Sequence, residues 1–263
     1  MKFKWLKKWL KKNLSQKGFL TFACFWLLTV GVIAGRICYD LKTYFFGNTL
    51  VYRFVSKSGY DYLLHLPKGY TDFGNPRPLL IYLHGAGETG KNMRKLKHHD
   101  LVHHVKGNIA TKDFPFIVIS PMTPRHGWQP KQVIRLLDEI LTDEGKRWKI
   151  DESQIYLTGM SMGGFGTFHT ACEFPNRFTA IIPVAGGGNI ENAEQLKNVP
   201  TWAFHGDADD VVPYECSSNM IEAMQTIGCR EAKLTTLKGA GHGITHEVYS
   251  KPEIYQWLLQ KRK

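Results

Sequence analysis

A serine between two glycines carries the strongest chemical signal in the chain. Residues 159–163 read GMSMG, which is the pattern G-x-S-x-G. The motif directly follows the apolar run 154–157 and directly precedes a run of helical character, 163–173. In that context it predicts a sharp turn that exposes the hydroxyl of Ser161, with a helix N-terminus that favours developing negative charge. The pattern therefore predicts a nucleophilic serine rather than an ordinary glycine-rich turn.

A serine hydroxyl is a weak nucleophile, so it needs a histidine as base and a carboxylate that orients the base. Residues 205–213 read HGDADDVVP and residues 239–243 read GAGHG, and each run follows an apolar stretch of strand character. They supply an acid and then a histidine, which is the chain order expected after this kind of serine turn. The candidate acids are Asp207, Asp209 and Asp210, and the candidate base is His242.

The remaining histidines favour structural positions. His246 follows His242 by four residues, and we expect it at the surface. His84 and His205 each end a predicted strand before a glycine, and we expect both to be structural. A further cluster has the i, i+4 spacing of metal ligands, but without another ligand motif it predicts a polar segment beside the site. Its members are His98, His99, Asp100, His103 and His104.

The elements that must position these residues alternate along the chain. Residues 50–55 and 60–66 predict a hairpin around the Ser-Gly pair at 58–59. Further strands are predicted at 79–83, 114–120, 154–157, 180–184, 201–204 and 232–237, and helices at 133–141, 163–173, 217–225 and 252–259. Strands that alternate with helices predict an α/β fold, with a mostly parallel central sheet flanked by helices and strand ends that bring side chains to one edge.

Together these motifs make the chain resemble the α/β-hydrolase superfamily, in particular its compact branch of carboxylesterases, phospholipase-like enzymes and predicted peptidases. That branch is similar to polyhydroxybutyrate depolymerases and feruloyl esterases. The resemblance covers about residues 50–260 and depends on the run LHGAGETG at 83–90, the serine turn, the aspartate loop and His242. It implies the α/β-hydrolase fold and ester hydrolysis through an acyl-enzyme intermediate.

The resemblance also assigns roles to individual residues. In such enzymes the acid stands two residues before a Val-Val-Pro run, which selects Asp209 over its two neighbours. One oxyanion N–H donor is implied at Ala86, and the other comes from Met162, the residue after the nucleophile. Trp128, in the run PMTPRHGW at 121–128, matches a pocket aromatic of the family. It is a candidate substrate-binding residue, with ordinary packing as the alternative.

The loop between two predicted strands limits the size of any lid. About fifteen residues separate the strand that ends at Val184 from the strand that begins at Thr201. Lipases of this superfamily often insert a lid domain there, and no large lid fits. We therefore expect an open site.

The N-terminal segment differs in composition from the rest of the chain. The net charge of the 263 residues is +11, but residues 1–36 hold seven lysines and one arginine without an acid, which leaves +3 for the remainder. A weakly basic remainder gives little reason to expect nucleic-acid binding. Residues 18–35 are uncharged and, at about 1.5 Å per residue, span roughly 27 Å, close to the thickness of the hydrocarbon core of a bilayer.

These features predict a basic cytoplasmic segment (1–17), a transmembrane signal-anchor (18–38), a linker (39–48) and an α/β-hydrolase catalytic domain (49–263). Because the lysines precede the apolar run, the positive-inside bias places the catalytic domain outside the cytoplasm. The alternative is a cleaved signal peptide and a secreted enzyme, because residues 32–34 supply a cleavage site.

The five cysteines do not have the density of a disulfide scaffold. Cys216 and Cys229 flank a predicted helix that would hold them roughly 15 Å apart, beyond the Cα separation of about 7 Å that a disulfide tolerates. We therefore expect free thiols.

The residues thus predict a membrane-anchored serine esterase, with no metal or organic cofactor, that acts on a small ester substrate. Ser161 attacks the ester carbonyl, His242 moves the proton and Asp209 orients His242. A serine peptidase or amidase is an alternative, because the same groups cleave amides. A non-catalytic surface-binding protein is a second alternative. The sequence leaves the acyl group, the alcohol and the oligomeric state open.

Overall fold

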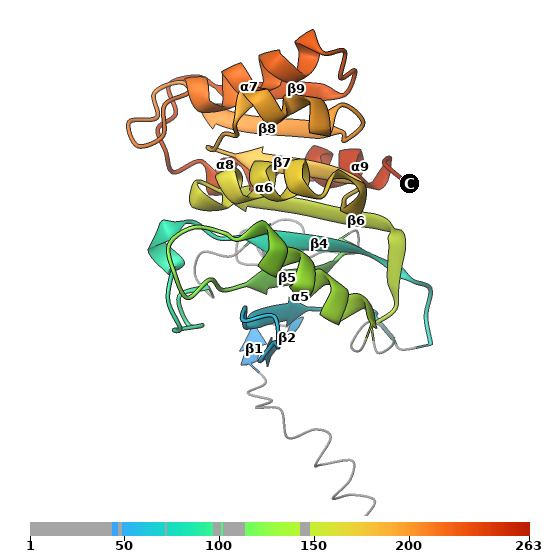
Figure 1. The fold of residues 1–263 in the computed structure, drawn as a ribbon. Helices are drawn as coiled ribbons and strands as arrows, with labels where there is room; N and C mark the ends of the chain where they lie inside the picture. Colours follow the sequence, from blue (N-terminus) through green and yellow to red (C-terminus); the bar gives the residue numbers. More distant parts are fainter. Residues whose placement is uncertain (1–43, 47–48, 72, 97–100, 102–113, 143–147) are drawn as a thin grey trace, which may run out of the picture. The chain divides into compact units, whose positions relative to one another are not determined.

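The computed structural model describes residues 44–46, 49–71, 73–96, 101, 114–142 and 148–263 (Figure 1). The chain divides into two units, 1–41 and 42–263, and all described residues lie in the second. The predicted basic segment and signal-anchor, residues 1–38, therefore lie outside the described residues. Within the described part, no helix is long and apolar enough to cross a membrane.

Nine strands of the described residues form one sheet, in the order β1-β2-β3-β5-β4-β6-β7-β8-β9 (Figure 1). Their bounds are β1 Tyr44–Phe46, β2 Thr49–Phe54, β3 Tyr62–His65, β4 Arg77–Leu83, β5 Ile117–Pro121, β6 Ile150–Met160, β7 Ala180–Val184, β8 Thr201–Gly206 and β9 Ala232–Leu237. Neighbouring strands from β5 to β9 are parallel, whereas β1, β2 and β3 pair antiparallel with one another and with β5. The mostly parallel sheet confirms the predicted α/β architecture, and the β2–β3 pair confirms the predicted hairpin.

Helices cover both faces of this sheet. They are α5 Pro130–Thr142, α6 Met162–Glu173, α7 Glu215–Thr226, α8 Thr245–Tyr249 and α9 Pro252–Leu259, with the 3-10 helices η1 Ala86–Glu88, η2 Pro175–Arg177 and η3 Ile190–Leu196. Alternate residues of a strand face opposite sides of a sheet. Accordingly, Leu79 and Ile81 of β4 share one core with α5, α6 and α7, whereas Leu80 and Tyr82 share another with α8 and α9. Both faces are buried, as parallel strands require.

The structure adds elements that the sequence patterns did not reveal. Residues 44–46, inside the predicted linker 39–48, form β1 and pair with β2, so the sheet begins before residue 49. Strand β6 begins at Ile150, which pairs with Arg77 of β4, rather than at residue 154. Polar residues at the start of β6 hide it from a search for apolar runs. The helix α8 is five residues long, which is too short to show a helical period.

The loop and the cysteines agree with the sequence predictions. Residues 185–200, all of them described, hold the short helix η3 and no inserted domain. Cys216 and Cys229 are free thiols, as is Cys172. Burial raises the pKa of Cys172 to about 11, so that thiol stays protonated and unreactive.

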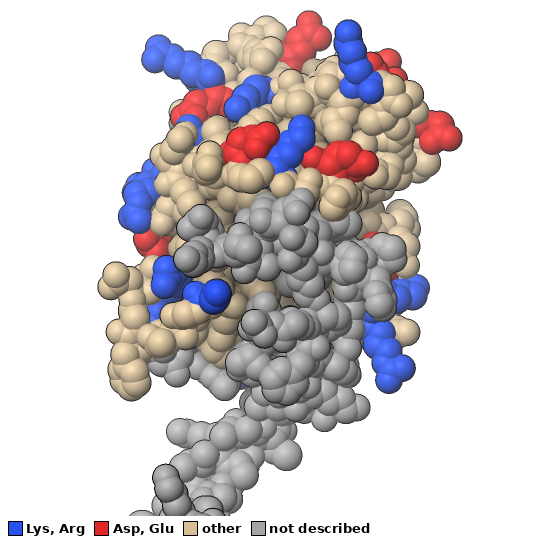
Figure 2. Space-filling model, turned by 180° about the vertical axis from the view of Figure 1, so that it is seen from behind, with Lys and Arg blue, Asp and Glu red and all other residues tan. Residues whose placement is uncertain are grey.

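Charged side chains of both signs are interspersed on the face that Figure 2 shows. Some described surface charges are paired: Arg177 lies 2.5 Å from Asp138, and Lys197 lies 3.7 Å from Glu194. Exposed pairs of this kind contribute at most about 1 kcal/mol each. The stability of the fold therefore comes mainly from the two cores.

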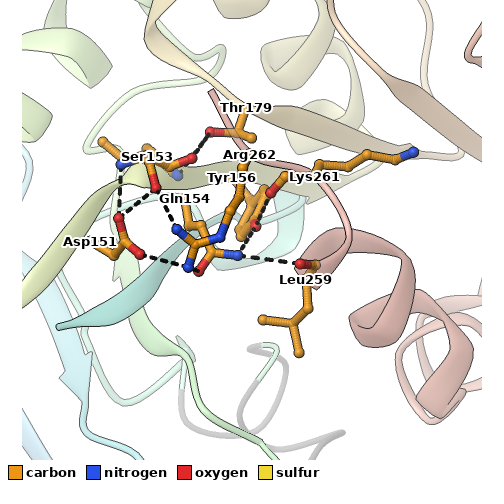
Figure 3. A network of polar contacts seen from close by, with 9 residues as sticks. Asp151, Ser153, Gln154, Tyr156, Thr179, Leu259, Lys261 and Arg262 are labelled. Carbon is orange, nitrogen blue, oxygen red and sulfur yellow. Dashed lines mark hydrogen bonds and ion pairs between the residues drawn. The ribbon is translucent and has the colours of Figure 1, made fainter. Parts of the chain in front are cut away.

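A polar network fixes the C-terminus to the amino end of β6 (Figure 3). The Arg262 guanidinium lies 3.1 Å from Asp151 Oδ2 and donates to Gln154 Oε1 over 3.0 Å. The Tyr156 hydroxyl donates to the Lys261 carbonyl over 2.9 Å. The strand that leads to the serine turn is thus held at its opposite end.

Candidate active site

Ser161 lies in the turn between β6 and α6, at the carboxyl edge of the sheet. Its φ of +57° is in the left-handed region that side chains rarely adopt, and its N–H donates to the Val184 carbonyl over 2.9 Å. Glycines make the turn possible. A Cβ on Gly163 would overlap the Leu83 carbonyl, and one on Gly159 would lie 2.5 Å from the Gly163 carbonyl oxygen. The sequence folds into this strained turn because G-x-S-x-G removes both Cβ atoms.

The imidazole of His242 lies between Ser161 and Asp209. Its Nδ1 is 2.8 Å from Asp209 Oδ2, and its Nε2 is 2.9 Å from Ser161 Oγ. Because a carboxylate only accepts hydrogen bonds, Nδ1 donates, which leaves Nε2 to accept the hydrogen bond from the serine hydroxyl. The His242 side chain is 22% exposed and the Asp209 side chain is fully buried. The arrangement can transfer a proton from the hydroxyl to Nε2.

Asp209 is held by the loop that follows β8. Its Oδ1 accepts the N–H groups of Val211 and Val212, each over 2.9 Å. Burial raises the pKa of Asp209, but hydrogen bonds from His242 and from these N–H groups outweigh burial and bring the pKa below its ordinary value. The carboxylate is therefore ionised near neutral pH.

The other two candidate acids have different surroundings from Asp209. Asp207 Oδ1 accepts the N–H of Gly239 over 2.6 Å, and Asp210 is exposed. A Cβ on Gly206 would overlap the Ala240 carbonyl, so glycine there lets the aspartate loop and the histidine loop approach closely. Of the three sequence candidates, the structure brings Asp209 to the histidine. His246, predicted at the surface, is exposed.

The two candidate oxyanion donors flank the serine. Ala86 opens η1, three residues after the end of β4, and Met162 is the first residue of α6. A Cβ on Gly85 would lie 3.8 Å from Ser161 Cβ, so the turn before Ala86 lies against Ser161. This placement can present two backbone N–H groups to a developing oxyanion.

His84 supports that turn from beneath and is fully buried. Its Nε2 accepts a hydrogen bond from the backbone nitrogen of Thr123 over 3.2 Å. The ring proton is therefore on Nδ1, which donates to the Gly85 carbonyl oxygen over 2.6 Å. Burial, above all, lowers the pKa of His84 to about 4, against the hydrogen bond to Gly85, which raises it. The neutral ring fixes the peptide that precedes Ala86.

Trp128 is packed in the core. It is 5% exposed, and its Nε1 donates to the His84 carbonyl over 3.1 Å. Its ring meets the rings of His84 and Tyr60 edge to face, with centroids 4.8 and 5.3 Å away. A Cβ on Gly166 of α6 would lie 2.8 Å from it. The structure thus favours the packing alternative for Trp128.

His205 has more contacts with the site than its sequence position indicated. It is fully buried at the end of β8, and its Nε2 lies 3.2 Å from Asp209 Oδ2. The only sequence signal was its position four residues before the acid.

The predicted cluster from His98 to His104 lies outside the described residues. Within the described part, no group of three histidine, cysteine, aspartate or glutamate side chains could hold a metal ion.

Comparison with known proteins gives one family. Residues 114–252 match the model of the phospholipase/carboxylesterase family. A bifunctional acetylxylan esterase/xylanase of Neocallimastix patriciarum is 28% identical over 142 residues, which are 52% of this chain and 20% of that protein. A probable feruloyl esterase C of Aspergillus niger is 25% identical over 190 residues, 71% of this chain and 68% of that protein. The crystal structure of a thermostable esterase is similar with a TM-score of 0.70 and 27% identity, over 82% of this chain and 64% of that one.

Proposed function

The chain belongs to the phospholipase/carboxylesterase family of α/β-hydrolases, and from that premise we propose that it hydrolyses carboxylic esters with Ser161 as nucleophile. The observation that carries the proposal is the His242 imidazole, 2.9 Å from Ser161 Oγ on one side and 2.8 Å from Asp209 Oδ2 on the other. A neutral imidazole held in this way accepts the serine proton as the hydroxyl attacks.

The first half of the reaction forms an acyl-enzyme. Ser161 Oγ attacks the ester carbonyl carbon while its proton moves to His242 Nε2, and the N–H groups of Ala86 and Met162 stabilise the resulting oxyanion. When the tetrahedral intermediate collapses, the bond to the alcohol oxygen breaks and Nε2 returns the proton to that oxygen. Asp209 stabilises the imidazolium between these steps and keeps Nδ1 protonated.

The second half releases the acid. A water molecule attacks the acyl carbonyl as its proton passes to His242 Nε2. The second tetrahedral intermediate then collapses, the bond to Ser161 Oγ breaks and the proton returns to that oxygen. The carboxylic acid leaves and the enzyme is restored.

The proposed substrates are short acyl esters or aryl esters. The relatives named above are a bifunctional acetylxylan esterase/xylanase and a probable feruloyl esterase, and residues 185–200 hold no lid domain. One exposed apolar side chain lies next to the proposed acid: Val211, at 64% exposure, is two residues after Asp209. An apolar side chain beside the site supports binding of an acyl or aryl group.

Membrane anchoring through residues 18–38 and an extracytoplasmic catalytic domain are also part of the proposal. They are supported by the uncharged run and the preceding lysines. We expect the full-length protein to stay in the membrane fraction after a carbonate wash, with the catalytic domain open to external protease. A soluble mature protein that begins at Gly35 or Arg36 would instead support a cleaved signal peptide.

The decisive experiment combines a fluorophosphonate probe with matched esters and anilides. We expect the probe to label the wild type and the Ser218→Ala control, and not Ser161→Ala, whose ester turnover falls by at least about a thousandfold. The Ser161→Ala change removes one oxygen from a partly buried turn and leaves no large cavity, so the fold should remain. If kcat/KM for anilides exceeds that for esters after correction for leaving-group reactivity, the enzyme is an amidase or peptidase instead.

A further inference from the structure

His205 lies directly under the loop that holds the acid. Its ring is fully buried, with Nε2 at 3.0 Å from the Val212 carbonyl oxygen and 3.2 Å from Asp209 Oδ2. On the other side of the ring, Nδ1 lies 2.7 Å from Ser217 Oγ of α7. Both ring nitrogens of this buried side chain therefore have polar partners, although the reaction described above does not use the ring.

The partners decide which ring nitrogens carry protons. Ser217 Oγ lies 2.5 Å from the Gly186 carbonyl oxygen, which can only accept, so the single hydroxyl proton of Ser217 points there. Ser217 Oγ must then accept from His205 Nδ1. The two neighbours of Nε2, a carbonyl oxygen and a carboxylate oxygen, are acceptors as well. The hydrogen bonds are satisfied only if both nitrogens of His205 carry a proton.

The charge of Asp209 leads to the same state. Its side chain has no solvent exposure, and a buried carboxylate is costly unless a cation accompanies it. His242 must be neutral at Nε2 to accept the serine proton. Among the described residues, the ion-pair partners of the Asp209 carboxylate within 4.0 Å are the two histidines, His242 and His205. His205 is then the group that can supply the positive charge in the resting enzyme.

The contacts continue from His205 to the serine turn. Ser217 donates to the Gly186 carbonyl, and Gly186 follows Ala185, whose φ of +44° lies in the left-handed region. A Cβ on Gly186 would lie 2.6 Å from the backbone nitrogen of Phe165 in α6, so this turn packs against the first turn of the helix that Ser161 caps. The acid loop and the nucleophile turn are thus tied together through His205 and Ser217.

We propose that His205 is a positioning residue of the reaction. It is a buried imidazolium that contacts Asp209 Oδ2 and holds the carboxylate in place, while His242, which contacts the same oxygen, stays neutral. The proposal rests on the proposed esterase function for its effect on rate, but not for the protonation state itself. Besides Asp209 and Ser217, Tyr214 also packs against His205. The two rings meet edge to face with their centroids 5.8 Å apart, and the Tyr214 hydroxyl is hydrogen-bonded to Thr236 Oγ1.

The positive charge on His205 changes the pH dependence of catalysis. His205 and His242 share Oδ2 of Asp209, so a positive His205 disfavours a proton on His242 and keeps the base active at lower pH. In His205→Gln, an amide N–H can still reach Asp209, but the charge is lost. We expect the acid limb of kcat/KM to move up by about half a pH unit to one unit. We also expect kcat to fall about tenfold with KM nearly unchanged, because His205 touches no substrate.

The protonation state is measured directly by nitrogen NMR of the full-length chain labelled at histidine, with His205→Gln to assign the signals. At about pH 8, where an ordinary histidine is neutral, we expect both His205 ring nitrogens to show the shifts of protonated nitrogens. An unprotonated ring nitrogen at that pH overturns the proposal, whatever the activity.

The kinetic arm uses a matched loss of another buried hydrogen bond. Tyr156→Phe removes a hydroxyl that donates to the Lys261 carbonyl at the far edge of the sheet, so it should lower stability without moving the acid limb. A His205→Gln profile that coincides with those of the wild type and Tyr156→Phe overturns the positioning role. A wild type without ester turnover or probe labelling rejects the esterase function, and the NMR spectrum then decides the protonation state alone.

Discussion

Asp209 and Asp151 lie at opposite edges of the same sheet and accept similar sets of hydrogen bonds. Asp209, after β8, accepts hydrogen bonds from two backbone N–H groups and from His242, and His205 Nε2 lies 3.2 Å from its Oδ2; its side chain has no solvent exposure. Asp151, near the start of β6, takes the N–H and hydroxyl of Ser153 over 3.1 and 2.6 Å and pairs with Arg262 over 3.1 Å, at 22% exposure (Figure 3). The two carboxylates thus both accept hydrogen bonds and contact cationic or imidazole side chains, but Asp209 is more deeply buried than Asp151.

The two regions differ in where the fold is strained and where it gains stability. The carboxyl edge carries a buried carboxylate and two left-handed non-glycine residues, Ser161 and Ala185. Such features cost free energy and persist only where the surroundings fix them. The amino edge carries exposed pairs, which cost little and contribute little each. A change at the carboxyl edge should therefore alter chemistry, and a change at the amino edge should alter only stability.

Asp209→Asn should reduce turnover more than any other change at these two carboxylates. The amide cannot hold His242 in the tautomer that needs a donor at Nδ1, so kcat should fall by about 10³–10⁴-fold. Asp210→Asn and Asp151→Asn are matched controls, because both carboxylates lie away from His242, and we expect kcat within about twofold of wild type. Ester turnover with a fixed substrate measures the series. A larger loss in Asp210→Asn than in Asp209→Asn would transfer the acid role to Asp210.

The next effect is on folding at the serine turn. In Gly163→Ala the new methyl group overlaps the Leu83 backbone, which cannot move away as a flexible side chain could, so unfolding free energy should drop by about 3 kcal/mol. Gly243→Ala places its methyl group in open space and should change stability by less than about 0.5 kcal/mol. Denaturant titration compares the two. Equal stabilities of the Gly163→Ala and Gly243→Ala proteins would show that the turn can adjust and that residue 163 need not lie so close to the Leu83 backbone.

Much of this site could be predicted from the sequence, for a physical reason. A strained strand-to-helix turn requires glycines at fixed offsets, and the acid and base must follow other parallel strands, so Ser161 and His242 stand out from spacing alone. The contacts of His205 could not be predicted, because they depend on side chains from β8, α7 and the loop after β7 that meet only in the fold. Trp128 shows the same limit: its position after β5 is visible in the sequence, but its burial under His84 is not. The short strand β1 and the polar start of β6 were not predicted from the sequence, because neither shows an apolar period.

Acid titration measures the contribution of the two carboxylates to stability. The hydrogen bonds of Ser153, above all, lower the pKa of Asp151, and the pKa of Asp209 is lowered as well. A carboxylate with a depressed pKa in the folded state contributes stability that is present above the unfolded pKa of about 4 and is lost as pH falls through the folded pKa. Wild-type stability should therefore fall below about pH 4, and less steeply in Asp151→Asn. Urea titrations at several acidic pH values measure the slopes, and identical slopes would show that Asp151 titrates alike in both states.

The smallest expected effect is that of Arg262→Gln at the amino edge. The Arg262 side chain is 61% exposed, so its pair with Asp151 is screened by water, and its loss should cost about 0.5–1 kcal/mol of unfolding free energy. Glutamine keeps part of the stem and a hydrogen-bond donor, so the change removes mainly charge. A double-mutant cycle with Asp151→Asn isolates the coupling between the two side chains, and added salt should reduce it. Because β6 leads from this network to Ser161, kcat is the sensitive control. If kcat changes by more than about twofold while the protein stays folded, the two edges are coupled through the strand, and the separation of chemistry from stability fails.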